Sequence, residues 1–268
     1  MPLAPGPHRP PTTRASLARD LTELGVAPAD TLLVHSSLRS LGWVCGGAQA
    51  VVQALTDAVG PQGTLAVPTQ TPDNSDPAQW RAPAVPESWW PIIRAQSPGF
   101  DPRVTPSRGM GRIPEILRTW PGATRSAHPQ TSFAALGPRA DSLTGHHPLR
   151  CALGEESPLA RLEEAGARVL LLGVGYESCT AFHLAEYRLP RPATAPSSCA
   201  VLRPDGTREW VTYTDVDLDA ADFADLGAAF EATGALTTGQ VGRAHARLFS
   251  LPRAVAFARS WLSEHRTA

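Results

Sequence analysis

Three short apolar runs stand out in the pattern of hydrophobic and polar positions along the chain. They cover residues 31–34, 64–67 and 168–173, and Gly, Pro or polar residues bound each of them. Runs of this length are typical of buried strands, and their unbroken apolarity indicates a sheet that is covered on both faces. Residues 47–59, between the first two runs, repeat apolar residues at helical spacing. Strand, helix and strand therefore alternate as in an α/β domain.

The rest of the pattern completes one domain over residues 14–268. Residues 199–216 alternate apolar and polar positions around a Pro-Asp-Gly turn, which predicts a hairpin near the C-terminus. We expect an α/β fold with a central mixed sheet flanked by helices, preceded by a flexible Pro-rich tail over residues 1–13. Helical spacing recurs in three further segments, at residues 13–24, 219–233 and 252–264.

One long segment, residues 70–104, follows neither periodicity. It holds Pro, Asp and Asn residues and contains Trp80, Trp89 and Trp90. Loops of this length in a compact domain are usually functional or mobile. We interpret this one as a lid on the substrate side of the fold.

The charged residues and the cysteines exclude several functions. The net charge is −1, with both signs mixed along the chain, so we expect no nucleic-acid partner. All 24 basic residues are arginine, which excludes a Schiff-base lysine and the lysine of a Walker phosphate loop. The four cysteines form no C-x-x-C motif, which argues against a zinc site and a disulfide framework. With neither a signal peptide nor an apolar run of about 20 residues, we expect a cytoplasmic protein without membrane contact.

Polar residues follow each of the three predicted strands. Because ligands of open α/β sheets collect beyond the carboxyl ends of the strands, these residues predict a cleft. The first strand leads into His35-Ser36-Ser37, the second into Thr69-Gln70-Thr71 and Asp73-Asn74, and the third into Tyr176-Glu177-Ser178 and Thr180.

The segment after the third strand contains a possible general base. Residues 179–188 hold few helix breakers, so His183 and Glu186 project from one face of a predicted helix, with Thr180 one turn earlier. A histidine oriented by a carboxylate is suited to proton transfer, and Thr180 near the helix N-terminus could support a developing oxyanion. The alternative is an amphipathic helix with an incidental surface histidine.

Other motifs carry less information. Residues 106–112, Pro-Ser-Arg-Gly-Met-Gly-Arg, precede a predicted helix at 113–118 and could hold a pyrophosphate, although an ordinary turn and helix start is an equal alternative. We interpret His128 as structural and the adjacent His146 and His147 as surface residues, and expect no metal site. No G-x-G-x-x-G or G-x-S-x-G motif occurs, so neither a dehydrogenase nor an α/β-hydrolase is supported.

Six blocks of the sequence occur together in a fixed order. They are LLVHSSLRSLG at 32–42, GPQGTLAVPT at 60–69, TPSRGMGRIPEILR at 105–118, SAHPQTSFAALG at 126–137, VLLLGVGYESCTAFHLAEYR at 169–188 and GQVGRAHARLFS at 239–250. In these blocks the sequence resembles the aminoglycoside 3-N-acetyltransferase family, over residues 24–262. The resemblance implies transfer of an acetyl group from acetyl-coenzyme A to the 3-amino group of a 2-deoxystreptamine antibiotic. It also implies a fold distinct from that of the more common acetyltransferase superfamily.

The resemblance also implies roles for individual residues. His183 becomes the catalytic base with Glu186 as its partner, and Thr180 is our candidate donor to the thioester in a direct transfer. Because an aminoglycoside is polycationic, we expect its binding residues among Asp73, Asn74, Asp101 and Glu177. The coenzyme would contact residues of the HSSL and TPSRGMGR segments, namely His35, Ser36, Ser37, Leu38, Ser107, Met110, Gly111 and Arg112.

Two other functions stay open from the sequence. The same coenzyme site could serve a biosynthetic acetyltransferase that acts on a different amine, and the segment 70–104 would then differ in its contacts. A protein that binds aminoglycosides without turning them over is the second alternative. Either a monomer or a homodimer is compatible with the sequence.

Overall fold

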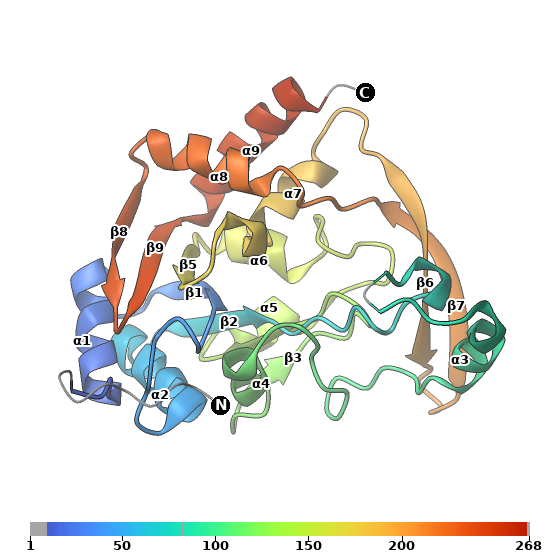
Figure 1. The fold of residues 1–268 in the computed structure, drawn as a ribbon, viewed down its shortest axis with the longest axis horizontal. Coiled ribbons are helices and arrows are strands. Elements are labelled where there is room, and N and C mark those ends of the chain that lie inside the picture. Colours follow the sequence, from blue (N-terminus) through green and yellow to red (C-terminus); the bar gives the residue numbers. More distant parts are fainter. Residues whose placement is uncertain (1–9, 82, 267–268) are drawn as a thin grey trace.

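A seven-stranded mixed sheet organises the protein (Figure 1), for which a computed structural model describes residues 10–81 and 83–266. The strand order is β3-β4-β2-β1-β5-β9-β8. The three middle strands, β2, β1 and β5, run parallel to one another, and antiparallel strands extend the sheet on both sides. The expected α/β fold with a central mixed sheet is therefore confirmed.

The helices and strands have the following bounds. The strands are β1 (Thr31–Ser36), β2 (Thr64–Pro68), β3 (Thr124–Arg125), β4 (Phe133–Leu136), β5 (Arg168–Leu172), β6 (Thr194–Leu202), β7 (Arg208–Val216), β8 (Leu236–Val241) and β9 (Ala244–Ser250). The α-helices are α1 (Arg14–Leu24), α2 (Gly47–Val59), α3 (Trp90–Gln96), α4 (Arg112–Arg118), α5 (Ala140–Thr144), α6 (Pro158–Glu164), α7 (Ala181–Tyr187), α8 (Phe223–Ala232) and α9 (Leu251–His265). Short 3₁₀ turns are η1 (Pro77–Gln79), η2 (Glu87–Trp89) and η3 (Tyr176–Ser178).

Each middle strand contributes to two separate cores. Successive side chains of a strand point to opposite faces, so Leu33 packs in the core beneath α5 to α9, while Leu32 and Val34 pack in the core beneath α1, α2 and α4. In Figure 1, α1 and α2 lie on one side of the sheet and α7, α8 and α9 on the other. Burial on both faces explains why these strands appear in the sequence as continuous apolar runs.

The predicted hairpin is confirmed, and it stands apart from the central sheet. Strands β6 and β7 pair only with each other among the described strands, from Thr194 opposite Val216 to Leu202 opposite Arg208. The turn between them places Gly206 at φ 82°, a left-handed conformation that favours glycine. In Figure 1 this hairpin forms one end of the molecule, beside α3.

The segment 70–104, which we interpreted as a lid, is fastened along this hairpin. The side-chain amide of Asn74 donates to the backbone carbonyl of Ala200 and accepts from its backbone N–H, each at 2.9 Å. Arg208 donates to the carbonyl of Ser97 at 2.8 Å, and Phe100 forms a bridge with Val201. The segment is therefore a brace for β6 and β7 along much of its length, and it contains η1, η2 and α3.

The chain ends differ somewhat from the expected boundaries. Residues 1–9 of the expected tail lie outside the described residues, but its last part belongs to the fold, because the amide of Thr12 donates to Trp43 and Thr13 caps α1.

The helix expected at 219–233 begins later, at Phe223. Arg266 donates to the backbone carbonyl of Asp219 and to the carboxylate of Asp222, each at 2.5 Å, and α8 begins only after these contacts.

Candidate active site

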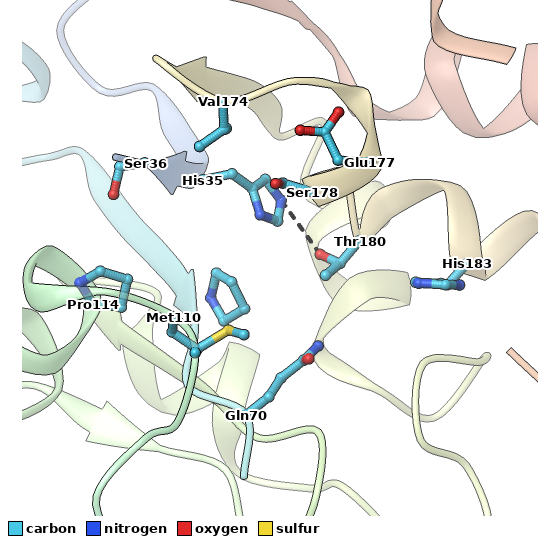
Figure 2. Close-up of a pocket in the computed structure, with 12 residues that line it drawn as sticks. His35, Ser36, Gln70, Met110, Pro114, Val174, Glu177, Ser178, Thr180 and His183 are labelled. Carbon is cyan, nitrogen blue, oxygen red and sulfur yellow. Dashed lines mark hydrogen bonds between the residues drawn. The ribbon is translucent and has the colours of Figure 1, made fainter. Parts of the chain in front are cut away.

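The carboxyl ends of the parallel strands open into a cavity of about 290 Å³. β1 lies between β2 and β5, so the segments that follow all three strands meet there, as the sequence predicts. The segment before α4 closes a further side (Figure 2). The lining residues are His35, Ser36, Pro68, Gln70, Gly109, Met110, Pro114, Val174, Glu177, Ser178, Thr180 and His183.

His183 and Glu186 form a short hydrogen bond inside α7. His183 Nδ1 lies 2.5 Å from Glu186 Oε2, and the glutamate side chain is only 2% exposed. The second carboxylate oxygen accepts from Arg266 Nη1 at 2.5 Å and from the amide of Asp219 at 3.1 Å. With both oxygens engaged, the carboxylate is held as an acceptor, so Nδ1 carries the proton and Nε2 keeps its lone pair.

The walls around this pair are partly aromatic. The ring of Phe223 lies 4.7 Å from that of His183 and tilts by 50°. Arg266 also binds Asp222, at 2.5 Å and 2.7 Å, and this bidentate contact joins the end of α9 to the start of α8. The sequence predicted the His183–Glu186 contact from helical spacing but missed Arg266, which lies 80 positions beyond Glu186 along the chain.

A second histidine of the cavity, His35, is almost fully buried. It occupies β1 and is 4% exposed. Burial, together with the nearby His183, lowers the pKa of its imidazole from 6.5 to about 3. His35 is therefore neutral at physiological pH. Its Nε2 lies 3.4 Å from the hydroxyl of Thr180, as the dashed line in Figure 2 marks.

The residues expected at the coenzyme divide into two groups. Ser36 and Met110 line the cavity, and the buried Ser36 hydroxyl has no hydrogen-bond partner among the described residues. Ser37 and Leu38 continue the chain after Ser36 and are half-buried. By contrast, Ser107 gives both its amide and its hydroxyl to Glu115, at 3.0 Å and 2.7 Å, whereas Gly111 and Arg112 are exposed at the start of α4. Gln70 lines the cavity, as expected from its place after the second strand, and Gly109 belongs to the predicted 106–112 segment, whereas sequence reasoning missed Pro68, Pro114 and Val174.

Of the four polar residues expected to bind substrate, Glu177 lines the cavity. Asp73 pairs with Arg108 at 2.8 Å, and Asp101 pairs with Arg103 at 2.7 Å. These two contacts, together with the bonds from Asn74 to the hairpin, turn the three side chains toward protein partners. The structure therefore does not bring Asp73, Asn74 and Asp101 into the cavity.

A second cavity, of about 490 Å³, adjoins the first and shares Val174 and Glu177 with it. Gly173 forms its floor at the end of β5 and has φ 71°. A Cβ at this position would lie 2.5 Å from that of Ser40, so a tight turn without a side chain is required. Its other walls include Ser37 and the cationic or titratable side chains Arg243, His245 and Arg247.

The interpretation of His147 as a surface residue is wrong. His147 is 6% exposed, and its two ring nitrogens contact the Ser126 hydroxyl at 2.9 Å and the Ala152 carbonyl at 2.8 Å. Burial lowers its pKa well below 6.5. The ring of His128 is centred 4.7 Å from that of His147 and tilted by 35°. His128 accepts from the backbone amides of Gln130 and Thr131, in agreement with its expected structural role. His146 is exposed, as expected.

The described residues contain neither a metal-binding cluster nor a membrane-spanning helix. Across 10–81 and 83–266, no group of three or more His, Cys, Asp or Glu side chains is arranged to hold a metal ion. Over the same residues, no helix combines the length and apolarity needed to cross a membrane.

The sequence is similar to known acetyltransferases over most of its length. The family model for aminoglycoside 3-N-acetyltransferases matches residues 33–263. The chain is 45% identical to the aminoglycoside N(3')-acetyltransferase-like protein YokD of Bacillus subtilis, over 94% of this chain and 92% of that protein. It is 39% identical to aminoglycoside N(3)-acetyltransferase VII of Streptomyces paromomycinus, over 95% and 92%.

Solved structures extend this similarity to the whole fold. The crystal structure of YokD from Bacillus subtilis matches with a TM-score of 0.93 and 43% identity, covering 96% of this chain and 95% of that one. The binary complex of AAC-IIIb with CoASH matches with a TM-score of 0.84 and 33% identity, covering 96% and 99%. AAC-VIa bound to sisomicin matches with a TM-score of 0.85 and 34% identity, covering 97% and 100%. On the extent of these matches, the chain belongs to the aminoglycoside 3-N-acetyltransferase family.

Proposed function

We propose that this acyltransferase moves an acetyl group directly from acetyl-coenzyme A to the 3-amino group of a 2-deoxystreptamine aminoglycoside, within a ternary complex. The observation that carries the proposal is the His183–Glu186 pair, with its 2.5 Å contact, at the wall of a cavity at the strand ends. A neutral imidazole with Nε2 free is suited to take a proton from an attacking amine near neutral pH.

The chemistry follows from where the hydrogen-bonding groups lie. The neutral amine attacks the thioester carbon and passes its proton to Nε2 of His183. The carbon–sulfur bond then breaks, and the leaving thiolate takes up that proton, which regenerates neutral His183 and yields the acetamide and the coenzyme thiol. Glu186 fixes the histidine tautomer and stabilises the transient imidazolium. Thr180 is the proposed donor to the thioester oxygen while negative charge develops there.

For the coenzyme, we assign the side of the cavity formed by residues 36–38 and by the 107–112 segment, because the side chain of His35 contacts Thr180 instead. The unpartnered Ser36 hydroxyl supplies a hydrogen-bonding group there, and Met110 supplies apolar surface. The relative AAC-IIIb is described as a complex with CoASH, which supports the use of acetyl-coenzyme A by this chain as well.

For the acceptor, we assign the side near Glu177. This carboxylate borders both cavities, and an aminoglycoside carries several ammonium groups that it can attract. The relative AAC-VIa is described as bound to sisomicin, which supports an aminoglycoside as the acceptor for this chain. Asp73, Asn74 and Asp101 stay in the proposal only as residues of the surrounding loops, because each already has a protein partner.

The test measures thiol release from acetyl-coenzyme A with sisomicin, gentamicin, kanamycin, neomycin and apramycin, and NMR then locates the acetyl group on each product. We expect acetylation of the 3-amino group. In His183→Ala we expect kcat to fall by about 10²- to 10⁴-fold, the usual contribution of a general base, while coenzyme binding persists.

His146→Ala is the matched control. His146 also lies beside a glutamate, Glu156 at 3.3 Å, but its side chain is 66% exposed and outside the cavity. Its removal is expected to leave turnover unchanged. Wild-type protein that binds aminoglycosides without any mass increase would favour a sequestering protein, and turnover confined to unrelated amines would favour a different acceptor.

A further inference from the structure

Thr180 occupies the N-cap position of α7, but its side chain does not cap the helix. The residues before α1, α6 and α9, namely Thr13, Ser157 and Ser250, have extended backbones and accept a bond from an amide of their own helix. This is the usual geometry of a side-chain cap. Thr180 instead has helical angles, φ −60° and ψ −20°, and its side chain makes no bond to the amides of α7. Its hydroxyl is therefore available to the cavity.

His35 is the protein partner that remains for this hydroxyl. The contact of 3.4 Å between His35 Nε2 and Thr180 Oγ1 joins residues 145 positions apart in the sequence. It is long for a hydrogen bond, as catalytic contacts often are before substrates bind. His35 sits in the rigid parallel part of the sheet, where its backbone pairs in register with Leu171 of β5. The sheet therefore fixes the backbone of His35, while Thr180 lies just before α7.

We propose that His35 is a positioning residue for the reaction, whose Nε2–H donates to Thr180 Oγ1 and so directs the Thr180 hydroxyl proton toward the thioester oxygen. The proposal rests on the function given above, because it assigns the orientation of a group in that mechanism. His35 acts through Thr180 and does not itself exchange a proton with either substrate.

The hydrogen-bond inventory selects this tautomer. A neutral imidazole has one N–H and one lone pair. The contact to Thr180 is the one hydrogen bond that the described residues offer the His35 ring. With the proton on Nε2, the N–H is partnered and Nδ1 presents only a lone pair. The opposite tautomer would leave the Nδ1–H without a partner among the described residues, whereas a lone pair on Nδ1 needs none. It would also make Thr180 the donor to His35 and take the hydroxyl proton away from the cavity.

The neutrality of His35 fits the same role. Burial keeps its pKa at about 3, so it stays uncharged when His183 becomes an imidazolium during turnover. A cation at His35 would repel that imidazolium, whereas a neutral donor orients Thr180 without opposing the charge that develops nearby.

The experiment is a double-mutant cycle of His35→Leu and Thr180→Val, with steady-state kinetics for both substrates. We expect His35→Leu to lower kcat by about 10- to 100-fold and Thr180→Val by about 10²- to 10³-fold, as for removal of an oxyanion donor, with both KM values changed by less than about 3-fold. If His35 acts through Thr180, the double variant is no more than about 3-fold slower than Thr180→Val alone. His35→Gln, whose amide can donate from near the position of Nε2, should recover most of the activity.

Three results would overturn the role. They are losses that multiply in the double variant, an effect of His35→Leu on the KM of the coenzyme without an effect on kcat, and a His35→Gln variant as slow as His35→Leu. Melting temperatures and calorimetric coenzyme binding show whether each variant is folded, and His35→Met enters the cycle if His35→Leu is not. A wild-type protein without acetyl transfer would refute the proposed function itself. Wild-type turnover combined with multiplying losses would refute only the role of His35.

Discussion

Replacing Glu186 by glutamine probes the charge beside the base with almost no change in volume. Glu186 Oε2 lies 2.5 Å from His183 Nδ1, and the side chain is 2% exposed, so solvent screens the pair weakly. Two unit charges about 4 Å apart interact by about 4 kcal/mol at an effective dielectric constant near 20. This interaction is available to the imidazolium of the transition state and largely absent from the neutral ground state.

The expected loss in Glu186→Gln is therefore about 3 to 4 kcal/mol of transition-state stabilisation. At 1.36 kcal/mol per decade, this corresponds to about 100- to 1000-fold in kcat/KM. The variant should still fold, because Arg266 keeps its two bonds to Asp222, at 2.5 Å and 2.7 Å. Loss of the charged bond to Arg266 is expected to lower the free energy of unfolding by about 1.5 to 3 kcal/mol.

The assay follows thiol release with a chromogenic reagent. Cys45 is an exposed free cysteine, so each variant needs a blank without aminoglycoside to subtract the reaction of the protein itself. Melting temperature and coenzyme affinity are measured in parallel. A Glu186→Gln enzyme within about 3-fold of wild type, folded and saturated with both substrates, would contradict the assignment of the carboxylate as partner of the base.

Two further predictions concern stability. In Glu115, burial alone would raise the carboxyl pKa, but bonds from Arg118 and Ser107 outweigh it and hold the pKa at about 2. A carboxyl group whose pKa is lower in the folded state stabilises the protein at pH values above its unfolded pKa, near 4.5. The stability advantage of wild type over Glu115→Gln, measured by urea unfolding, should therefore shrink as the pH falls from about 6 to about 2. An advantage that is independent of pH would contradict this. Asn74→Ala removes two 2.9 Å bonds to the buried backbone of Ala200 and should lower the free energy of unfolding by about 2 to 3 kcal/mol, without a matching rise in the KM for aminoglycoside. Gln79→Ala, which loses one exposed 3.3 Å bond to the same hairpin, is the control and should cost less than about 0.5 kcal/mol.

The sequence predicted the middle of the sheet and missed its edges. Strands β1, β2 and β5 are buried on both faces and therefore appear as continuous apolar runs. β8 lies at the sheet edge, is largely exposed and contains Gly239, so its sequence lacks such a run. β9 does alternate, with Ala244, Ala246 and Leu248 inward and His245 outward, and this period of two was a signal that could have identified it.

The site was predictable where its contacts are local in the chain. His183 and Glu186 are three residues apart on a helix, whereas Arg266 reaches Glu186 from the end of α9, and helical periodicity contains no information about that approach. Adjacent histidines also say little about burial, since His146 is exposed while His147 is enclosed. For Asp101, the partner was visible in the sequence, because Arg103 follows two residues later.

The end of β1 places two neighbouring side chains, His35 and Ser36, on different sides of the cavity. Successive side chains leave a strand on opposite faces, so His35 continues the face of Leu33, beneath α7, while Ser36 continues the face of Val34, beneath α2 and α4. In Figure 2, His35 accordingly points toward Thr180, and Ser36 lies on the side of Pro114. The register of β1 with β5, His35 opposite Leu171 and Ser36 opposite Leu172, fixes this division. A slip of β1 by one residue would exchange the faces on which these two side chains lie. The same apolar pattern that builds the two cores thus separates the side of the proposed base from the side of the proposed coenzyme.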